Sequence, residues 1–204
     1  MPRIRATSID EHKALTRSSL LSSAKQLIAD AGTAEIPLGE IALAAGVGRT
    51  TLYDYFADRD DLIATLVEDE LPGVIDELIA TASRSGTVGE RLAELAARTV
   101  EFVATDPVLG LILHREVGRM GPEAQQRIRA AHSNLADAMV GLYFEGVERE
   151  EFRPMPPDLA GRLIQDTIMS AAKSVISAPD PQERIETVTR NLRLFLLGGL
   201  RFDR

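Results

Sequence analysis

Residues 38–62 constrain the fold more than any other stretch of this chain, because two glycines interrupt a helical pattern there. Apolar side chains at helical spacing lead up to Gly46 and Gly48, and Leu52 and Phe56 follow. At 100° per residue, Leu52 and Phe56 lie about 40° apart on one side of a second short helix. That helix packs inward through these two residues and presents its other side chains outward. Such a helix-turn-helix suits the major groove of DNA.

The composition predicts an all-α protein of about nine helices. Leu and Ala dominate the apolar residues, which form 45% of the 204 residues, and runs of β-branched residues are scarce. No convincing strand, internal repeat or low-complexity tract interrupts the helical pattern. We therefore expect an N-terminal three-helix head that contains the helix-turn-helix, followed by a larger helical body.

Capping residues, glycines and prolines indicate where these helices begin and end. The first helix is expected from about Asp10 to Ala31, with a capping box at Ser8 and Glu11, and a stop at Gly32. Next, we expect the second helix to begin at Pro37, the third to run from Arg49 to Phe56, and Asp58 and Asp61 to cap the fourth, which kinks or breaks at Leu71-Pro72-Gly73. Later in the body, new helices are expected after Gly86, at Asp106-Pro107 and at Gly121-Pro122, the last continuing to Tyr143. Two final helices are expected beyond Pro154–Pro157.

Charge divides the chain near residue 57. Residues 1–56 carry six Lys or Arg and six Asp or Glu, so the net charge of −8 belongs entirely to the remaining residues. We expect a DNA-binding domain at 1–57, with its motif at about 37–56, and a second domain at 58–204. A neutral head can hold phosphates if its few cations share one face, and it predicts weak non-specific DNA affinity.

Several classes of protein are disfavoured by what the chain lacks. It has no cysteine, which excludes disulfides and thiolate chemistry and makes the reducing cytoplasm the simplest location. It has no secretory signal and no apolar run of 18 residues, so no membrane association is expected. His12, His114 and His132 lack metal-ligand spacing, and we expect no metal, no cofactor and no catalytic residues.

The head resembles the TetR family of bacterial transcriptional regulators. The resemblance spans about residues 12–70 and rests on Leu20-Leu21-Ser22-Ser23-Ala24, Gly32, Ile41-Ala42-Leu43-Ala44-Ala45-Gly46-Val47, Thr51-Leu52-Tyr53-Asp54-Tyr55-Phe56 and Arg59-Asp60-Asp61-Leu62. It implies a homodimer whose two heads dock in successive major grooves of a pseudo-palindromic operator. It also implies a body with a small-molecule pocket and a four-helix dimer interface made by its last two helices. Ligand binding would then move the fourth helix and pull the heads out of register.

The chain departs from the family pattern at two positions. Ile36-Pro37 stands where the family usually has a Thr or Ser cap that touches a phosphate, and Thr33 stands where an aromatic residue is common. One phosphate contact is therefore expected to be missing, while the core pattern is kept.

Two sets of residues are candidates for DNA contact, each against the alternative of an ordinary solvated or packed surface. Arginine grips guanine, threonine meets the thymine methyl group and aspartate accepts from cytosine, whereas tyrosine hydroxyls and arginines hold phosphates. The predicted base readers are Arg49, Thr50, Thr51, Tyr53 and Asp54, and the predicted phosphate contacts are Arg17, Tyr53, Tyr55 and Arg59. Arg3 and Arg5 form either a DNA-reaching arm or a plain tail.

The body offers candidates for a pocket and for a dimer interface. Its apolar stripes contain few polar residues, which suggests an apolar or amphipathic effector, although each pocket candidate could equally be core. The pocket candidates are Phe102, Leu109, Leu113, His114, Met120, Met139, Tyr143 and Met169. The nearly unbroken apolar run at 195–200 favours a two-fold interface, for which the candidates are Leu163, Ile168, Val188, Leu192, Phe195 and Leu196.

Together these patterns predict a dimeric DNA-binding repressor that a small ligand releases. One alternative is a small helical ligand-binding module or an enzyme without DNA binding. For an enzyme the chain offers only a carboxylate cluster at Glu148, Glu150 and Glu151, at what reads as a solvated helix end. Another alternative is a regulator-like protein that has lost DNA binding and serves only as a protein partner.

Overall fold

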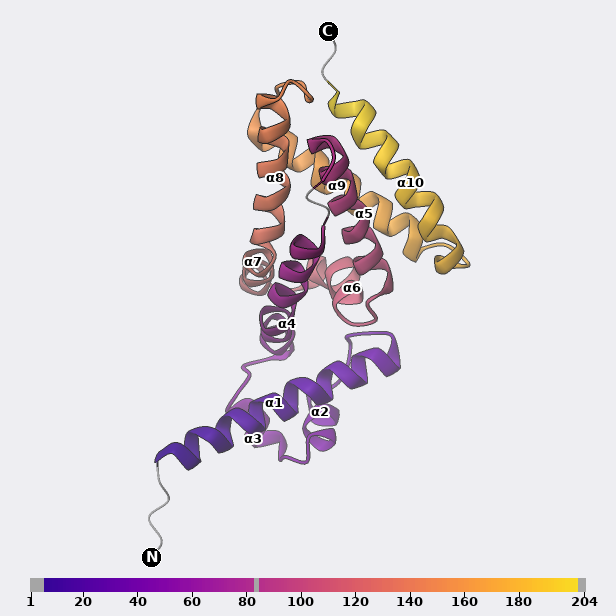
Figure 1. Ribbon diagram of the computed structural model, residues 1–204. Coiled ribbons are helices and arrows are strands. Elements are labelled where there is room, and N and C mark those ends of the chain that lie inside the picture. The colour runs from indigo at the N-terminus through magenta and orange to yellow at the C-terminus, as the bar shows by residue number, and fades with distance from the viewer. Residues whose placement is uncertain (1–5, 83–84, 202–204) are drawn as a thin grey trace, which may run out of the picture.

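The computed structural model describes residues 6–82 and 85–201, and Arg3 and Arg5 lie outside this described part. As predicted, the fold is all-α, and the only extended pairing among the described residues is one isolated bridge between Phe152 and Arg201 (Figure 1). The elements are α1 (Ala6–Ala31), α2 (Leu38–Ala44), α3 (Arg49–Tyr53), α4 (Arg59–Thr81), α5 (Val88–Thr105), α6 (Leu109–Leu111), the π-helical η1 (Ile112–Glu116), the 3₁₀-helical η2 (Val117–Arg119), α7 (Pro122–Ala131), α8 (Ser133–Glu148), α9 (Pro157–Ile176) and α10 (Pro181–Leu200). None of the helices in the described part is long and apolar enough to cross a membrane.

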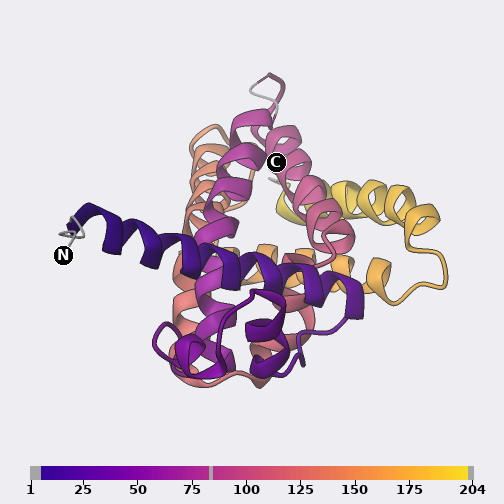
Figure 2. The same ribbon diagram turned by 90° about the horizontal axis from the view of Figure 1, so that it is seen from below.

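The first three helices form the head at one end of the molecule. Leu20 and Ile28 of α1 are buried against Ile41, Leu52 and Phe56, and burying each side chain of this size contributes about 1.5–3 kcal/mol. Figure 2 shows α1 crossing below the body, with its N-terminal turns projecting beyond the rest of the molecule. The head is therefore a small core that leaves α3 at the outer surface.

Two expected boundaries in the head are wrong, and two are confirmed. Helix α1 already begins at Ala6, before the expected start near Asp10 and before the expected cap position at residue 8. Pro37 is the N-cap of α2 and not its first helical residue, and no side chain caps this helix. Gly32 ends α1 with a φ of 63°, and Asp58 caps α4 by accepting a hydrogen bond from the amide of Asp61.

The body surrounds α5, which packs against α8, α9 and α10 (Figure 1). Helix α4 continues through Pro72 as one helix, which resolves the expected kink or break in favour of continuity. Pro72 has no amide hydrogen to donate, but Leu71 and Ile75 are both buried and hold the helix on either side of it. The N-terminal half of α4 shares one hydrophobic core with the head and with α6 and α7, so burial is continuous across residue 57.

The expected single helix from Gly121 to Tyr143 is two helices, α7 and α8, which raises the count to ten α-helices in the described part. The break lies at His132, whose backbone has a φ of −110° and a ψ of 12°. Its ring Nδ1 lies 2.7 Å from the Ile128 carbonyl oxygen, which can only accept, so the ring donates the bond that the backbone amide of an unbroken helix would donate.

Candidate DNA-binding face and ligand cavity

Helix α3 has the orientation that its sequence predicts. Leu52 and Phe56 have 0% and 2% of their surfaces exposed, and they anchor α3 to the head. Gly46 adopts a φ of 71°, which allows the sharp turn before α3, whereas Gly48 keeps an ordinary φ of −70°. Four of the five predicted base readers are exposed and Thr51 is half-buried; the exposed ones are Arg49, Thr50, Tyr53 and Asp54.

Arg49 and Tyr53 are coupled on the exposed side of α3. The Arg49 guanidinium donates to the Tyr53 hydroxyl over 3.3 Å, and it lies 5.8 Å from the centre of the tyrosine ring. The two side chains are one helical turn apart, so each limits the conformations of the other. This arrangement presents a cation and a hydroxyl together at the surface.

The predicted phosphate contacts are placed less favourably. Arg17 forms a two-pronged ion pair with Asp69 of α4 at 2.6 and 3.0 Å, and Tyr55 is half-buried. Arg59 points between the head and the body, where it donates to the Ala34 carbonyl and to Glu116, both at 2.7 Å. Because these bonds occupy the guanidinium of Arg59, we exclude this residue from the proposed DNA surface.

A second arginine connects the body to α4. Arg127 of α7 donates to Asp61 over 2.6 Å, to Thr65 over 2.8 Å and to Glu68 over 2.5 and 2.9 Å. The hydrogen bonds with Glu68 raise the pKa of Arg127 above its ordinary value, against the effect of partial burial. Burial acts to raise the pKa of Asp61, but bonds from the Ala57 amide and from Arg127 bring it below its ordinary value. The α7 helix and the start of α4 are therefore firmly joined.

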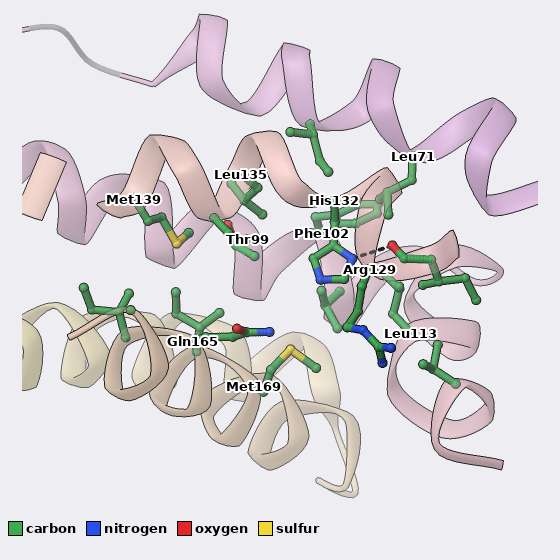
Figure 3. Close-up of a pocket in the computed structure, with 18 of the residues that line it drawn as sticks. Leu71, Thr99, Phe102, Leu113, Arg129, His132, Leu135, Met139, Gln165 and Met169 are labelled. Carbon is green, nitrogen blue, oxygen red and sulfur yellow. Dashed lines mark hydrogen bonds between the residues drawn. The ribbon is translucent and has the colours of Figure 1, made fainter. Parts of the chain in front are cut away.

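A cavity of about 400 Å³ lies inside the body (Figure 3). Its lining comes from α4, α5, η1, η2, α7, α8 and α9 and is mostly apolar. Four of the predicted pocket residues line it, namely Phe102, Leu113, Met139 and Met169. A volume of this size is within the usual range for sites that bind small molecules.

The other four predicted pocket residues lie elsewhere. Leu109 and Met120 are buried in the core that the body shares with the head. Tyr143 is buried, stacks on Phe152 and donates to the Arg153 carbonyl over 3.0 Å, so it supports the segment before α9. His114 is half-buried next to the lining residue Leu113 but is not itself part of the lining.

Comparisons with known proteins decide the family. The family model described as "Bacterial regulatory proteins, tetR family" matches residues 20–66, and the one described as "Tetracyclin repressor-like, C-terminal domain" matches residues 85–173. The chain belongs to the TetR family. It is therefore a ligand-responsive transcriptional regulator with a helix-turn-helix head and a ligand-binding body, and not an enzyme.

Individual relatives agree with this assignment. The chain is 24% identical over 150 residues to the fatty acid metabolism regulator protein of Bacillus subtilis (strain 168), which covers 73% of this chain and 77% of that protein. It is 25% identical over 129 residues to the HTH-type transcriptional regulator BetI of Rhizobium meliloti (strain 1021). This match covers 62% of this chain and 64% of that protein.

Solved structures share the fold. The transcriptional regulator FadR from Bacillus subtilis, in complex with stearoyl-CoA, superimposes with a TM-score of 0.75 at 20% identity, over 90% of this chain and 99% of that chain. RolR in complex with resorcinol superimposes with a TM-score of 0.66 at 22% identity, over 92% of this chain and 95% of that chain. At these identities the likeness establishes a common TetR fold and nothing about the ligand of this chain.

The residues predicted for a TetR-type dimer interface fall into two groups. Leu163, Val188, Leu192 and Phe195 line an open groove of about 600 Å³ between α9 and α10. Leu163 and Phe195 have 47% and 65% of their surfaces exposed, as large apolar side chains without a packing partner do. Ile168, Leu192 and Leu196 are buried in the core of this one chain, which leaves them little surface for a partner, although Leu192 also borders the groove.

Sequence reasoning missed the polar part of the cavity lining. Thr99, Arg129, His132 and Gln165 line the cavity among the apolar residues (Figure 3). Arg129 and His132 are three residues apart, and Ile128 before them also lines the cavity, so one face of α7, together with the residue that ends it, supplies all three. That spacing was readable in the sequence, but which face of α7 meets the cavity was not.

Proposed function

We propose that this chain is a homodimeric, cytoplasmic repressor, and that a small apolar or amphipathic effector in the body cavity releases it from a pseudo-palindromic operator. The domain at 1–57 reads the DNA, and the domain at 58–204 binds the effector and dimerises. The orientation of α3 supports this most strongly, because its two apolar side chains are buried and its polar ones face solvent. A helix with this division fits a major groove.

Each side chain on the exposed side of α3 is proposed to contact a different group of the DNA. Arg49 is suited to a guanine, Thr50 and Thr51 to a thymine methyl group, and Asp54 to a cytosine amino group. Tyr53 is placed to donate to a base or to a phosphate oxygen beside Arg49. Phosphate contact by Tyr55 and by Arg17 stays a secondary prediction, since Asp69 already pairs with Arg17.

Release is proposed to pass through α7. This helix lines the cavity through Ile128 and Arg129, and through His132 directly after it, and it is bonded to α4 through Arg127. An effector that displaces α7 therefore acts directly on α4, whose first residue, Arg59, is bonded to the α1–α2 connection. The relatives crystallised with stearoyl-CoA and with resorcinol are consistent with a cavity of this kind as the effector site.

A DNA-binding titration with two matched variants tests the proposal. The operator is first selected from random or upstream DNA and footprinted, and affinity is then measured by mobility shift. Tyr53→Ala removes one hydrogen bond from each of the two heads. The variant should therefore bind the operator at least about 30-fold more weakly. Tyr53 is 46% exposed and Phe144 of α8 is 41% exposed, so Phe144→Ala serves as the control and should bind normally.

Equal melting temperatures for both variants exclude unfolding as the cause. Normal operator binding by a folded Tyr53→Ala protein would remove α3 as the reading helix. Absence of any sequence-dependent binding at physiological salt would remove the DNA-binding proposal altogether.

A further inference from the structure

The cavity has a single charged side chain in its lining. Among the described residues that line it, Arg129 alone carries a permanent charge, and no carboxylate faces it there. Arg129 also has no hydrogen bond or ion pair within the described part of the chain, whereas Arg127, two residues earlier, has four hydrogen bonds. An exposed guanidinium at the edge of an apolar cavity, without a carboxylate partner, is suited to receive an anionic group of a ligand.

Figure 3 draws the Arg129 guanidinium between Leu113 and Met169, which identifies the end of the cavity that carries the charge. Two further cations belong to this end. Lys173 follows Met169 by one turn on the same side of α9, and Arg115 follows Leu113 by two residues in η1. Neither of them has an ion pair among the described residues, although the chain as a whole has a net charge of −8.

Arg115 and Lys173 lie near each other, because both act on His114. Burial lowers the pKa of His114, and the positive charges of Arg115 and Lys173 lower it further. No carboxylate is among the groups that act on this imidazole. The end of the cavity between η1 and α9 is therefore a positive region in an acidic body.

We propose that the effector is an anionic amphipath whose apolar part fills the cavity and whose acid group binds Arg129. This inference rests on the proposed function, since it takes the cavity to be the effector site. Apolar contacts with Phe102, Leu135 and Met139 hold the apolar part, and the planar guanidinium receives a carboxylate or a phosphate through two bonds. Arg115 and Lys173 add attraction from the same end. A neutral aromatic molecule uses none of these charges.

The acid group has two possible sources with the same chemistry. It is either the carboxylate of a free fatty acid or the phosphates of a larger acyl ester that extends out of the cavity. The charged end is partly open, because Arg129 and Gln165 are both exposed. Either acid group can therefore reach Arg129 while the acyl chain of the ligand lies inside the cavity. A comparison of their affinities distinguishes the two ligands.

Calorimetry on the purified full-length dimer tests the inference, because the chain has no Trp to report binding by fluorescence. The probes are dodecanoic acid, dodecan-1-ol and dodecanoyl-CoA below their micellar concentrations. Arg129→Gln removes the charge at the cavity, and Arg153→Gln removes an equally unpaired exposed charge outside it.

We expect the acid to bind at least about 10-fold more tightly than the alcohol, which a charge-assisted hydrogen bond supplies. Arg129→Gln should reduce the affinity for the acid about 10-fold and leave the affinity for the alcohol within about 2-fold. Arg153→Gln should change neither. Tighter binding of the acid than of the CoA ester assigns the site to a carboxylate, and the reverse order assigns it to the phosphates of the ester.

Equal affinities for acid and alcohol, or an unchanged affinity for the acid in Arg129→Gln, would overturn the inference. If the alcohol alone binds and releases the operator, the proposed function stands while the anionic effector is refuted. If none of the three binds, the inference also fails, and the mobility shift with operator DNA still tests the DNA-binding part separately.

Discussion

Removing Arg59 should destabilise the whole molecule, because this residue joins the head to the body. Its guanidinium donates to the Ala34 carbonyl in the head and to Glu116 at the end of η1, both at 2.7 Å. The side chain of Glu116 is only 5% exposed, whereas that of Arg59 is 32% exposed. Arg59→Met therefore leaves a carboxylate that is buried without its cation.

The magnitude follows from this burial. Breaking a fully buried ion pair costs about 3–5 kcal/mol, and the partial exposure of Arg59 lowers this to roughly 2–3 kcal/mol. The lost bond to Ala34 adds about 1 kcal/mol. We therefore expect Arg59→Met to lower the free energy of unfolding by about 3 kcal/mol. In Arg59→Met/Glu116→Leu no charge is left buried, so only the Ala34 bond is lost and the cost should fall to about 1 kcal/mol.

Urea unfolding at one fixed protein concentration measures both variants, and an unchanged m-value shows that the same surface unfolds. The difference between single and double variants gives the coupling directly. A cost below about 1 kcal/mol for Arg59→Met, or an equal cost for both variants, would refute the reasoning that Glu116 depends on its cation.

Three further predictions concern the head, the dimer and the DNA contacts. Leu52→Ala should lower the free energy of unfolding by about 3 kcal/mol in the same assay, while Leu43→Ala, at a position 80% exposed, should change it by less than about 0.5 kcal/mol. Phe195→Asp should give a monomer by light scattering, and Leu15→Asp, at a position with the same 65% exposure, should stay dimeric; the opposite result would place the interface elsewhere. Arg49→Gln should weaken operator binding by about 1–3 kcal/mol per head and relax the preference for guanine while the slope of log affinity against log salt stays nearly unchanged, and a slope reduced by about two per dimer would show that Arg49 holds a phosphate instead.

Local rules made the head predictable from its sequence. The buried placement of Leu52 and Phe56 follows from helical spacing, and the positive φ of Gly46 follows from the sharp turn. The Asp58 cap is likewise a short-range pattern. Each of these depends on residues that are only a few positions apart, so no knowledge of the distant chain was needed.

The cavity was only half predictable because its lining comes from helices far apart in sequence. Leu109 and Leu113 stand on the same apolar stripe, yet Leu109 joins the core shared with the head and Leu113 lines the cavity. The break at His132 depends on a bond from its own ring, which apolar spacing does not reveal. Without that break, the face of α7 that carries Arg129 could not be assigned to the cavity.

The residues predicted for the dimer interface also depend on packing between helices that are far apart in the sequence. Helices α9 and α10 are apolar on more than one side, and sequence alone does not say which side α5 covers. The structure shows that α5 packs against both helices and that Ile168 and Leu196 lie in the core it belongs to. Leu163 and Phe195 stay exposed, together with Leu194, which is 65% exposed and was not predicted.

The arginines fall into two groups, those that connect helices through ion pairs and those that are proposed to bind a ligand or DNA. Arg17, Arg59 and Arg127 each pair with carboxylates across two elements, and all three connect α4 to its neighbours. Arg49 and Arg129 have no carboxylate partner in the described part of the chain, and they stand on the exposed side of α3 and in the cavity. Paired charges resist displacement, whereas an unpaired guanidinium gains most from an incoming anion. An acid group bound at Arg129 acts on the same helix that holds α4 through Arg127. In the proposed release mechanism, an acid that binds a displaced α7 more tightly would shift the head away from its DNA-binding position by an amount that this difference in affinity sets.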